Sequence, residues 1–344
     1  MNAKPEQSRL NLALIGCGRI AQSHLDALAQ NPACNLTSVV DVNEEAAHAV
    51  AAKFGCRAFT DYRDLAREDR LDAVIICTPP ATHAEIALFF LAQKIHVLCE
   101  KPLAVRVEDA SRMIKAAEQE GVLLMMASKF RYTEDVIALR RLIASSVLGE
   151  VALFENIFSG KTDMSTRWNS NKALSGGGVL IDNGCHSVDI ARYLLGPLVE
   201  VQALEGKRLQ DIAVEDSVTL NFRTASEVMG TIDLSWSIHK ERESFLDIYG
   251  TKGVAHVGWK SSKYKLYEDG EWISLGTGYD KFRAFAAQLE NFVGAIMGKA
   301  TPLITGKDAL ESVKVIQAAY HAMHLKRWVE VESKESLHVY RKAA

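Results

Sequence analysis

A histidine and two aspartates are spaced so that they could move a proton. Asp182, His186 and Asp189 follow three consecutive glycines, at intervals of four and three residues, which places them on one face of a helix. Apolar neighbours predict that this helix is buried, where polar groups need a partner or a function. Because carboxylates orient an imidazole and favour its protonated form, His186 is suited to accept a proton from a hydroxyl. A structural Asp182–His186 pair in the core explains the same spacing.

A lysine at the end of a predicted strand could stabilise charge on a reacting oxygen. Lys101 follows the apolar run 95–99 and precedes Pro102, which restricts the lysine backbone and permits a cis bond. An ammonium group there would stabilise a developing alkoxide in hydride transfer and polarise a carbonyl in the reverse direction. A lysine that simply lies in water is the alternative interpretation.

A glycine-containing turn near the N-terminus indicates a dinucleotide site. The apolar run 12–15 leads into Gly16-Cys17-Gly18-Arg19-Ile20-Ala21, after which a helical pattern begins. Gly16 permits the tight turn, Gly18 lets a pyrophosphate approach the backbone, and Ala21 keeps the helix close to its strand. Arg19 and Ile20 then open a helix whose unpaired N–H groups favour an anion. Such a turn also occurs in proteins without a ligand, so the neighbouring sequence decides whether it indicates a dinucleotide site.

The next predicted strand supplies that context. Residues 36–40 end in Asp41, near the spacing of roughly 20 residues at which a carboxylate meets the adenosine ribose. A carboxylate repels the 2′-phosphate of NADP, and Val42 and Asn43 offer no cation in its place. We therefore expect NAD, with NADP not excluded. Capping of the helix that begins near Asn43 is a second role open to Asp41.

Further cofactor contacts are expected at the carboxyl ends of the later strands, where ligands bind in such sheets. Thr78 and Pro79 follow the run 73–77, and His83 lies four residues beyond. His83 could contact the cofactor or cap the first turn of its helix. Glu100 ends the strand before Lys101 and is expected beside the cofactor as well.

These residues require a doubly wound α/β domain to position them. Strand-like runs at 10–15, 36–40, 72–77, 95–99 and 122–126 alternate with helical patterns near 19–30, 43–54, 82–93 and 107–120, which predicts a parallel sheet covered on both faces. After residue 127, alternating runs at 214–222, 228–238 and 245–249 indicate an antiparallel sheet. Helices near 281–298 and 307–326 pack on that sheet or reach back to the first domain. We expect domains at 1–126 and 127–344.

Composition limits the classes of partner. Lys and Arg total 40 against 43 Asp and Glu, a net charge of −3, so no general attraction to nucleic acid or an anionic membrane is expected. No apolar run reaches the roughly 18 residues of a membrane span, and residues 1–9 lack a secretory apolar core. The six cysteines have no paired spacing, which predicts reduced thiols, no disulfide and no metal site. A cytoplasmic location is the expectation.

The motifs together resemble the glucose-fructose oxidoreductase, inositol dehydrogenase and rhizopine-catabolism (Gfo/Idh/MocA) family over nearly the whole chain. The resemblance rests on the glycine turn, on Glu100-Lys101-Pro102 and on the stretch from Gly176 to Asp189. It implies a Rossmann domain, a C-terminal α+β domain whose large, mostly antiparallel open sheet often mediates dimers or tetramers, and an active site between the domains. It also implies that Lys101, Asp182 and His186 form the catalytic group.

The substrate is less defined by sequence. Arg131, Arg167, Trp168 and Asn171 are candidates to line the site, and Trp168 could equally touch the nicotinamide. Aromatic faces and hydrogen-bonding cations suit a carbohydrate. We expect an NAD-dependent dehydrogenase of a sugar, cyclic polyol or sugar derivative. A ketosugar reductase, on a free or nucleotide-linked sugar, and a ligand sensor without turnover are the alternatives.

Overall fold

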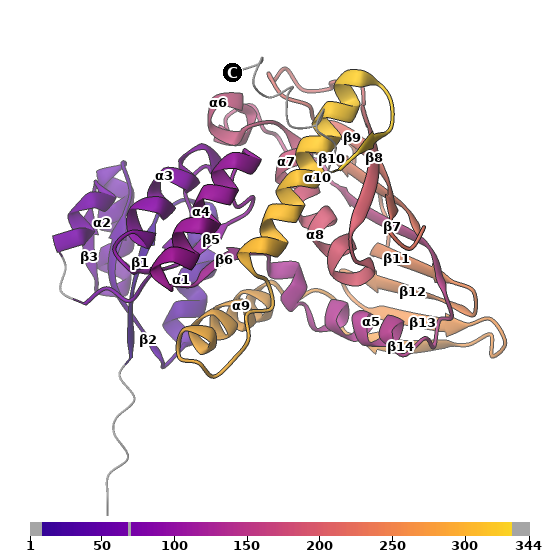
Figure 1. The fold of residues 1–344 in the computed structure, drawn as a ribbon, viewed down its shortest axis with the longest axis horizontal. Coiled ribbons are helices and arrows are strands. Elements are labelled where there is room, and N and C mark those ends of the chain that lie inside the picture. Colours follow the sequence, from indigo (N-terminus) through magenta and orange to yellow (C-terminus); the bar gives the residue numbers. More distant parts are fainter. Residues whose placement is uncertain (1–8, 68–69, 332–344) are drawn as a thin grey trace, which may run out of the picture. The chain divides into compact units, whose positions relative to one another are not determined.

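The computed structural model describes residues 9–67 and 70–331, which form two compact units (Figure 1). Of the described residues, unit 1 comprises those up to Ala104, Glu108–Lys129 and Lys281–Ala309. Unit 2 comprises Val105–Val107, Phe130–Asp280 and the described residues from Leu310 to Val331.

Unit 1 contains a six-stranded parallel sheet in the order β3-β2-β1-β4-β5-β6. Its strands are β1 (Leu10–Ile15), β2 (Cys34–Val40), β3 (Arg57–Phe59), β4 (Ala73–Ile76), β5 (His96–Glu100) and β6 (Leu124–Ala127). The strand order reverses between β1 and β4, so right-handed crossovers place the earlier and later helices on opposite faces. Covering of both faces explains the continuous apolar runs of β1 and β4. The predicted doubly wound sheet is confirmed.

The helices of unit 1 come from two distant parts of the sequence. They are α1 (Arg19–Gln30), α2 (Glu44–Phe54), α3 (Pro80–Leu91), α4 (Val107–Glu120) and α9 (Lys281–Ile296). A 3₁₀ turn covers Tyr62–Arg67. α9 packs on α1, where the His24 and Phe285 rings meet edge to face with centroids 4.9 Å apart. Of the two positions expected for this helix, α9 has the one against the first domain, and Lys281–Ala309 are therefore grouped with unit 1.

Unit 2 contains a nine-stranded sheet in the order β14-β13-β12-β11-β7-β10-β9-β8-β15. Its strands are β7 (Val151–Ser159), β8 (Leu198–Glu205), β9 (Ser217–Thr224), β10 (Met229–Ser235), β11 (Ser244–Gly250), β12 (Gly253–Gly258), β13 (Ser262–Leu266), β14 (Trp272–Gly276) and β15 (Val329–Glu330). Neighbours are antiparallel except β7 and β10, which are parallel. The mostly antiparallel sheet is as predicted, whereas β7, β8 and β12–β14 are additional to the runs identified by sequence.

One face of this sheet is covered by the helices of unit 2. They include α5 (Glu134–Ala144), α6 (Lys172–Ser175), α7 (Val179–Asp182), α8 (Gly184–Leu195) and α10 (Gly306–Leu325). Side chains alternate along β10, where Ile232 and Leu234 are buried and Met229 is 61% exposed. On β8, Leu204 is 50% exposed. The second face therefore presents apolar side chains to the surface.

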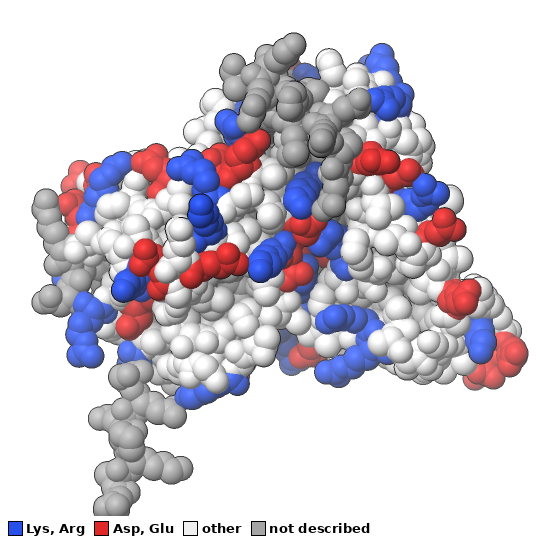
Figure 2. All heavy atoms as spheres, viewed as in Figure 1, with Lys and Arg blue, Asp and Glu red and all other residues white. Residues whose placement is uncertain are grey.

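Charges of both signs are interspersed over the described part of the face shown in Figure 2. Within the described residues, none of the helices combines the length and apolarity that a membrane crossing requires.

Candidate active site

The turn between β1 and α1 is built around Gly16. Its φ is +93°, and a Cβ there would lie 2.8 Å from the Cys77 carbonyl carbon and 2.9 Å from the Thr78 nitrogen. Only glycine adopts this backbone without strain and leaves room for the end of β4. The motif thus brings the first and fourth strands together at their carboxyl ends, where a nucleotide binds in such a sheet.

Gly18 leaves the N-terminus of α1 accessible. It is the N-cap residue, and no side chain caps the helix by a hydrogen bond. Among the described residues, a Cβ at Gly18 would meet nothing within 4 Å. The first N–H groups of α1, which begins at Arg19 and Ile20, therefore fit a pyrophosphate in both space and charge.

The Asp41 carboxylate supports this turn. Its Oδ2 accepts a hydrogen bond from the Cys17 N–H at 2.7 Å, and its Oδ1 accepts one from the Asn43 N–H at 2.8 Å. The N-cap of α2 is Asn43, whose side chain accepts from the Ala46 N–H. Each Asp41 oxygen keeps acceptor capacity for a ribose hydroxyl, so the residues of this edge fit NAD.

His83 links the two loops that follow β4 and β5. The ring is fully buried, with Nε2 2.9 Å from the Thr78 carbonyl oxygen and Nδ1 2.9 Å from the Pro102 carbonyl oxygen. Burial lowers the pKa of His83, against the hydrogen bonds to these carbonyls. The buried ring therefore links these two loops, and it does not cap the first turn of α3. Pro79 is the N-cap residue of that helix.

Glu100, which immediately precedes Lys101, is buried and paired with His24. Its Oε1 lies 2.8 Å from His24 Nε2, and its Oε2 accepts a hydrogen bond from the Lys101 N–H at 3.1 Å. Burial raises the pKa of Glu100, but the hydrogen bond and charge of His24, with Lys101 and Lys129, bring it below its ordinary value. The peptide bond between Lys101 and Pro102 is cis. Glu100 thus orients the backbone of Lys101 from below.

In unit 2, Asp182 and His186 lie one turn apart on a nearly continuous helical path. α7 and α8 are joined by Asn183, whose φ and ψ of −82° and −37° are helical. The His186 N–H donates to the Asn183 carbonyl at 3.1 Å. The prediction that the glycine run opens a buried helix is confirmed, since most residues of α8 are buried and His186 is only 9% exposed.

Asp189 forms a buried ion pair with Arg131. Its Oδ1 accepts from Arg131 Nη2 at 2.6 Å and its Oδ2 from Arg131 Nε at 2.9 Å, with Arg131 only 3% exposed. Arg131 is thus an additional buried partner of Asp189, which the spacing of Asp182, His186 and Asp189 did not indicate. Arg131, a predicted substrate contact, is held in this buried pair because a guanidinium matches a carboxylate bidentately.

A cluster of aromatic side chains, which no sequence motif indicated, lies on one side of His186. The Phe130 ring meets His186 edge to face at 5.1 Å and stacks on Tyr279 at 5.1 Å. Trp259, whose ring lies 6.4 Å from Phe130, is 43% exposed. Phe130 lies more than 100 residues before Trp259 and Tyr279 in the sequence, so no local pattern marks the cluster.

The loop with the other predicted substrate contacts lies between β7 and α6. Arg167 is half-buried and Trp168 is 42% exposed on a short 3₁₀ turn. Asn171 is exposed, and its side chain caps α6 by accepting from the Ala173 N–H at 3.0 Å. These three side chains are therefore presented at the surface of unit 2.

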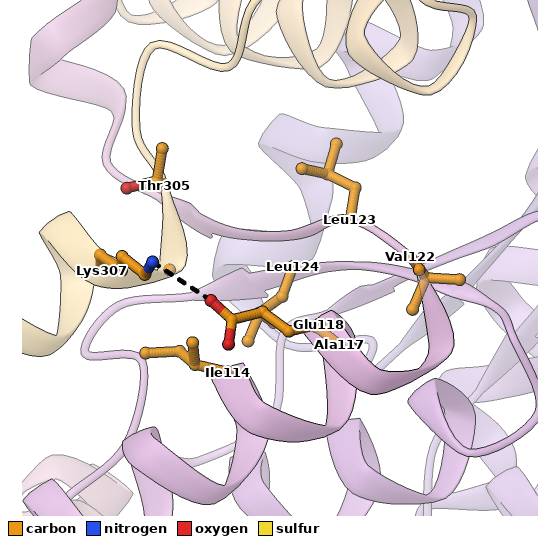
Figure 3. Close-up of a pocket in the computed structure, with 10 residues that line it drawn as sticks. Ile114, Ala117, Glu118, Val122, Leu123, Leu124, Thr305 and Lys307 are labelled. Carbon is orange, nitrogen blue, oxygen red and sulfur yellow. Dashed lines mark ion pairs between the residues drawn. The ribbon is translucent and has the colours of Figure 1, made fainter.

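A cavity elsewhere in unit 1 is separate from these residues. Figure 3 shows this space of about 360 Å³, bordered by the turn from α4 to β6 and the start of α10, where Lys307 Nζ pairs with Glu118 Oε1 at 3.4 Å. Leu124, the first residue of β6, lines it. The cavity is therefore at the amino end of β6, whereas the cofactor candidates follow the carboxyl ends of strands. In residues 9–67 and 70–331, no three His, Cys, Asp or Glu side chains gather to hold a metal ion.

Comparison with protein families identifies the class. The family described as "Oxidoreductase family, NAD-binding Rossmann fold" matches residues 10–128, and "GFO/IDH/MocA C-terminal domain" matches residues 136–256. The chain belongs to the Gfo/Idh/MocA family of oxidoreductases, and its first matched segment is the NAD-binding Rossmann fold of that family.

Individual relatives extend over almost the full chain. Inositol 2-dehydrogenase of Rhizobium meliloti (strain 1021) is 28% identical and covers 94% of this chain and 99% of its own length. D-apiose dehydrogenase of Paraburkholderia graminis is 25% identical, and the match covers 95% of this chain and 91% of the relative. The structure of levoglucosan dehydrogenase in complex with NADH superimposes with a TM-score of 0.89 at 22% identity, over 95% and 100% of the two chains. This last likeness concerns the fold.

Proposed function

We propose that this oxidoreductase oxidises a secondary alcohol of a sugar, cyclic polyol or sugar derivative, in which hydride leaves the carbon that carries the hydroxyl and the hydroxyl gives up its proton. The observation that carries the proposal is the buried helical path that places His186 one turn from Asp182, in a chain with an intact nucleotide turn. Relatives that act on inositol and on D-apiose support a carbohydrate substrate.

In this proposal three side chains form the catalytic group. His186 accepts the hydroxyl proton, Asp182 orients its imidazole, and the Lys101 ammonium stabilises the oxygen as negative charge develops. Bound NAD supplies the hydride acceptor. Glu100 contributes by fixing the backbone of Lys101 through its hydrogen bond to the Lys101 N–H.

Cofactor contacts are assigned to the carboxyl edge of the parallel sheet. Gly16, Gly18, Arg19 and Ile20 would hold the pyrophosphate, and Asp41 the adenosine ribose. Thr78, Pro79 and Trp168 are proposed on the nicotinamide side. His83 and Glu100 are buried, so we assign them to support of the loops that carry Thr78 and Lys101.

Substrate contacts are proposed for Arg167, Asn171 and the aromatic cluster beside His186. The C–H face of a pyranose or cyclitol ring packs well on aromatic side chains, while its hydroxyls need hydrogen-bonding groups. We assign Arg131 a positioning role, because it binds Asp189 on the helix that carries His186. The same groups serve reduction of a ketosugar, so direction follows from substrate supply.

The surface of the nine-stranded sheet supports a homodimer or homotetramer. Leu204, Met229 and Trp272 on its second face are 50%, 61% and 43% exposed, and apolar side chains on an open sheet favour association. Replacing Leu204 and Met229 by Asp should shift light-scattering mass toward the monomer; an unchanged mass places the interface elsewhere. A cytoplasmic location is in keeping with six free cysteines.

The test of function is nicotinamide absorbance with a panel of cyclitols, aldoses, sugar acids and nucleotide sugars, using NAD and NADP in parallel. Turnover that disappears in His186→Asn supports the dehydrogenase. Reduction of a ketose by NADH, with no oxidation of any hydroxyl compound in the panel, favours the ketosugar reductase. NAD binding with no turnover on any class contradicts the proposal and favours a sensor.

A further inference from the structure

Two adjacent acidic residues in unit 2 contact two different parts of the site. Glu215 and Asp216 immediately precede β9, and their relative exposures are 5% and 0%. Buried carboxylates are retained where hydrogen bonds compensate for lost water. The partners of these two residues lie in separate segments, which gives each residue its own target.

Glu215 holds the beginning of α7. Its Oε1 accepts hydrogen bonds from the Gly178 N–H at 2.8 Å, the Leu180 N–H at 3.3 Å and the Tyr320 hydroxyl at 2.7 Å. Its backbone carbonyl accepts from the Val179 N–H at 2.9 Å. Three N–H groups at the start of the helix are thus satisfied by one residue, as a capping side chain would do.

The close approach of Glu215 explains a glycine of the motif. A Cβ on Gly178 would clash with the Glu215 carbonyl oxygen, and one on Gly177 would clash with the Tyr320 hydroxyl. Gly177 and Gly178 therefore leave the room that Tyr320 and Glu215 need to contact the start of α7. Further along the same path, the Asp182 N–H donates to the Gly178 carbonyl at 3.1 Å, and the His186 N–H donates to the Asn183 carbonyl at 3.1 Å.

Asp216 acts on the substrate side of unit 2. Its Oδ2 accepts from the Leu209 N–H at 2.8 Å, the Gln210 N–H at 2.9 Å and the Ser237 hydroxyl at 2.6 Å. These bonds keep the pKa of Asp216 below its ordinary value although burial opposes this. Asp216 thereby fixes the backbone at Gln210.

Gln210 extends this contact to the loop of Arg167 and Trp168. Its Oε1 accepts from the Met164 N–H at 2.9 Å, and its Nε2 donates to the Thr162 carbonyl at 2.9 Å. The Arg167 N–H in turn donates to the Met164 carbonyl at 3.0 Å. A chain of hydrogen bonds therefore runs from Asp216 to the residue before Trp168.

We propose that Glu215 and Asp216 are positioning residues with divided effects: Glu215 aligns the helix of Asp182 and His186 for proton transfer, and Asp216, through Gln210, orders residues 162–168 for substrate binding. The inference rests on the proposed function, because loss of Glu215 is expected to lower kcat and loss of Asp216 to raise KM for that reaction.

The experiment compares Glu215→Ala, Glu215→Gln and Asp216→Ala in the full chain with the substrate found in the panel. Glu215→Ala should lower kcat about tenfold or more with KM within about threefold, because misalignment acts on the reacting groups. Glu215→Gln keeps the acceptor at Oε1 and should recover most of kcat. Asp216→Ala and Gln210→Ala should raise KM about tenfold with kcat within about threefold.

Asp135→Ala is the matched control. Asp135 is also buried and accepts from a hydroxyl and a backbone N–H, but these belong to Ser262 at the start of β13 and to Gly278, two residues after β14. Loss of the Asp135 carboxylate should lower the melting temperature without a selective change in either kcat or KM. If Glu215→Ala and Asp216→Ala give the same kinetic pattern as Asp135→Ala, both acidic residues are structural only and the inference fails.

A second readout separates this failure from failure of the proposed function. In ¹³C-histidine spectra, the resonance missing from His186→Asn identifies His186, and its titration midpoint should move in Glu215→Ala but stay in Glu215→Gln and Asp216→Ala. This result needs no turnover. An unchanged midpoint in Glu215→Ala overturns the role of Glu215 even when the wild type is active, whereas a moved midpoint in an inactive wild type rejects only the proposed activity.

Discussion

The Arg131 guanidinium holds the Asp189 carboxylate through two hydrogen bonds of 2.6 and 2.9 Å, with both side chains almost completely buried. This pair ties the turn after β6 to α8, three residues beyond His186. The Arg131 guanidinium also lies 5.1 Å from the centroid of the Tyr193 ring. Such a buried pair is costly to break from one side, because the remaining charge has no water to solvate it.

We expect Arg131→Met alone to lower the free energy of unfolding by about 3–5 kcal/mol. The double variant Arg131→Met, Asp189→Leu should regain most of this loss, since it leaves no buried charge. Urea denaturation of both proteins measures the difference. Arg112→Met, which breaks an exposed ion pair with Asp109, is the control and should change stability by at most about 1 kcal/mol. A double variant as unstable as the single one would contradict this account.

The two glycines of the nucleotide turn should respond differently to alanine. Gly16→Ala should lower the unfolding free energy by about 2 kcal/mol or more, because of the positive φ and the contact with the end of β4. Gly18→Ala should stay within about 0.5 kcal/mol of wild type. NADH fluorescence titration should nevertheless show at least about tenfold weaker binding in Gly18→Ala. Full affinity in that variant would place the pyrophosphate away from Gly18.

Cofactor preference should move with Asp41 and its exposed neighbour. Asp41→Ser with Val42→Arg removes the repelling carboxylate and supplies a cation at a position that is 93% exposed. We expect the ratio of kcat/KM for NADP over NAD to rise about 10²-fold. Val42→Arg alone is the control, and it should raise the ratio less. No change in the double variant would leave Asp41 with only its hydrogen bonds to Cys17 and Asn43.

Stability in acid should depend on Glu100. Because its folded pKa lies below the ordinary value of 4.5, the unfolded chain binds more protons in the window just below that value. The contribution of Glu100 is therefore present above about pH 4.5 and is lost as the pH falls through the folded pKa. Glu100→Gln should flatten the dependence of unfolding free energy on pH between about 3 and 5. An unaltered slope would show that another carboxylate controls this range.

Lys101 and His186 should affect turnover far more than cofactor binding. Lys101→Met and His186→Asn are each expected to lower kcat about 10²-fold or more, because both act on charge in the transition state. The dissociation constant of NADH should change less than about threefold. Lys115→Met on the exposed part of α4 is the matched control. Near-normal kcat in either site variant would reject its catalytic role.

Local sequence signals predicted the parts of the fold that depend on local chemistry. The run from Gly16 to Ala21 fixes the start of α1, and the expected helix 19–30 coincides with Arg19–Gln30. β7 was not identified, because buried Asn156 interrupts its apolar alternation while its amide donates to the distant Phe245 carbonyl. A strand of this kind takes its polar partner from a neighbour that sequence does not reveal.

The site shows the same limit. Lys101, Asp182 and His186 stand out by motif, whereas the partners of Asp189 and Glu215 are 58 and up to 105 residues away. The adjacent acidic pair before β9 was the available signal for Glu215 and Asp216. Its meaning depends on which backbone N–H groups the fold brings within reach, and long-range packing alone decides that.

The return of α9 to unit 1 has a consequence for synthesis of the chain. The apolar face of α9, with Phe285, Leu289 and Phe292 buried, reaches its place against α1 only after more than 250 intervening residues have been made. A nascent chain released at residue 128 would expose the partner surface of α1, and closure of so long a loop is slow. The nucleotide-binding unit therefore cannot complete its packing until translation has passed residue 309, although its first strand is near the start of the sequence. Expression of that half alone would require residues 281–309 to be joined to it.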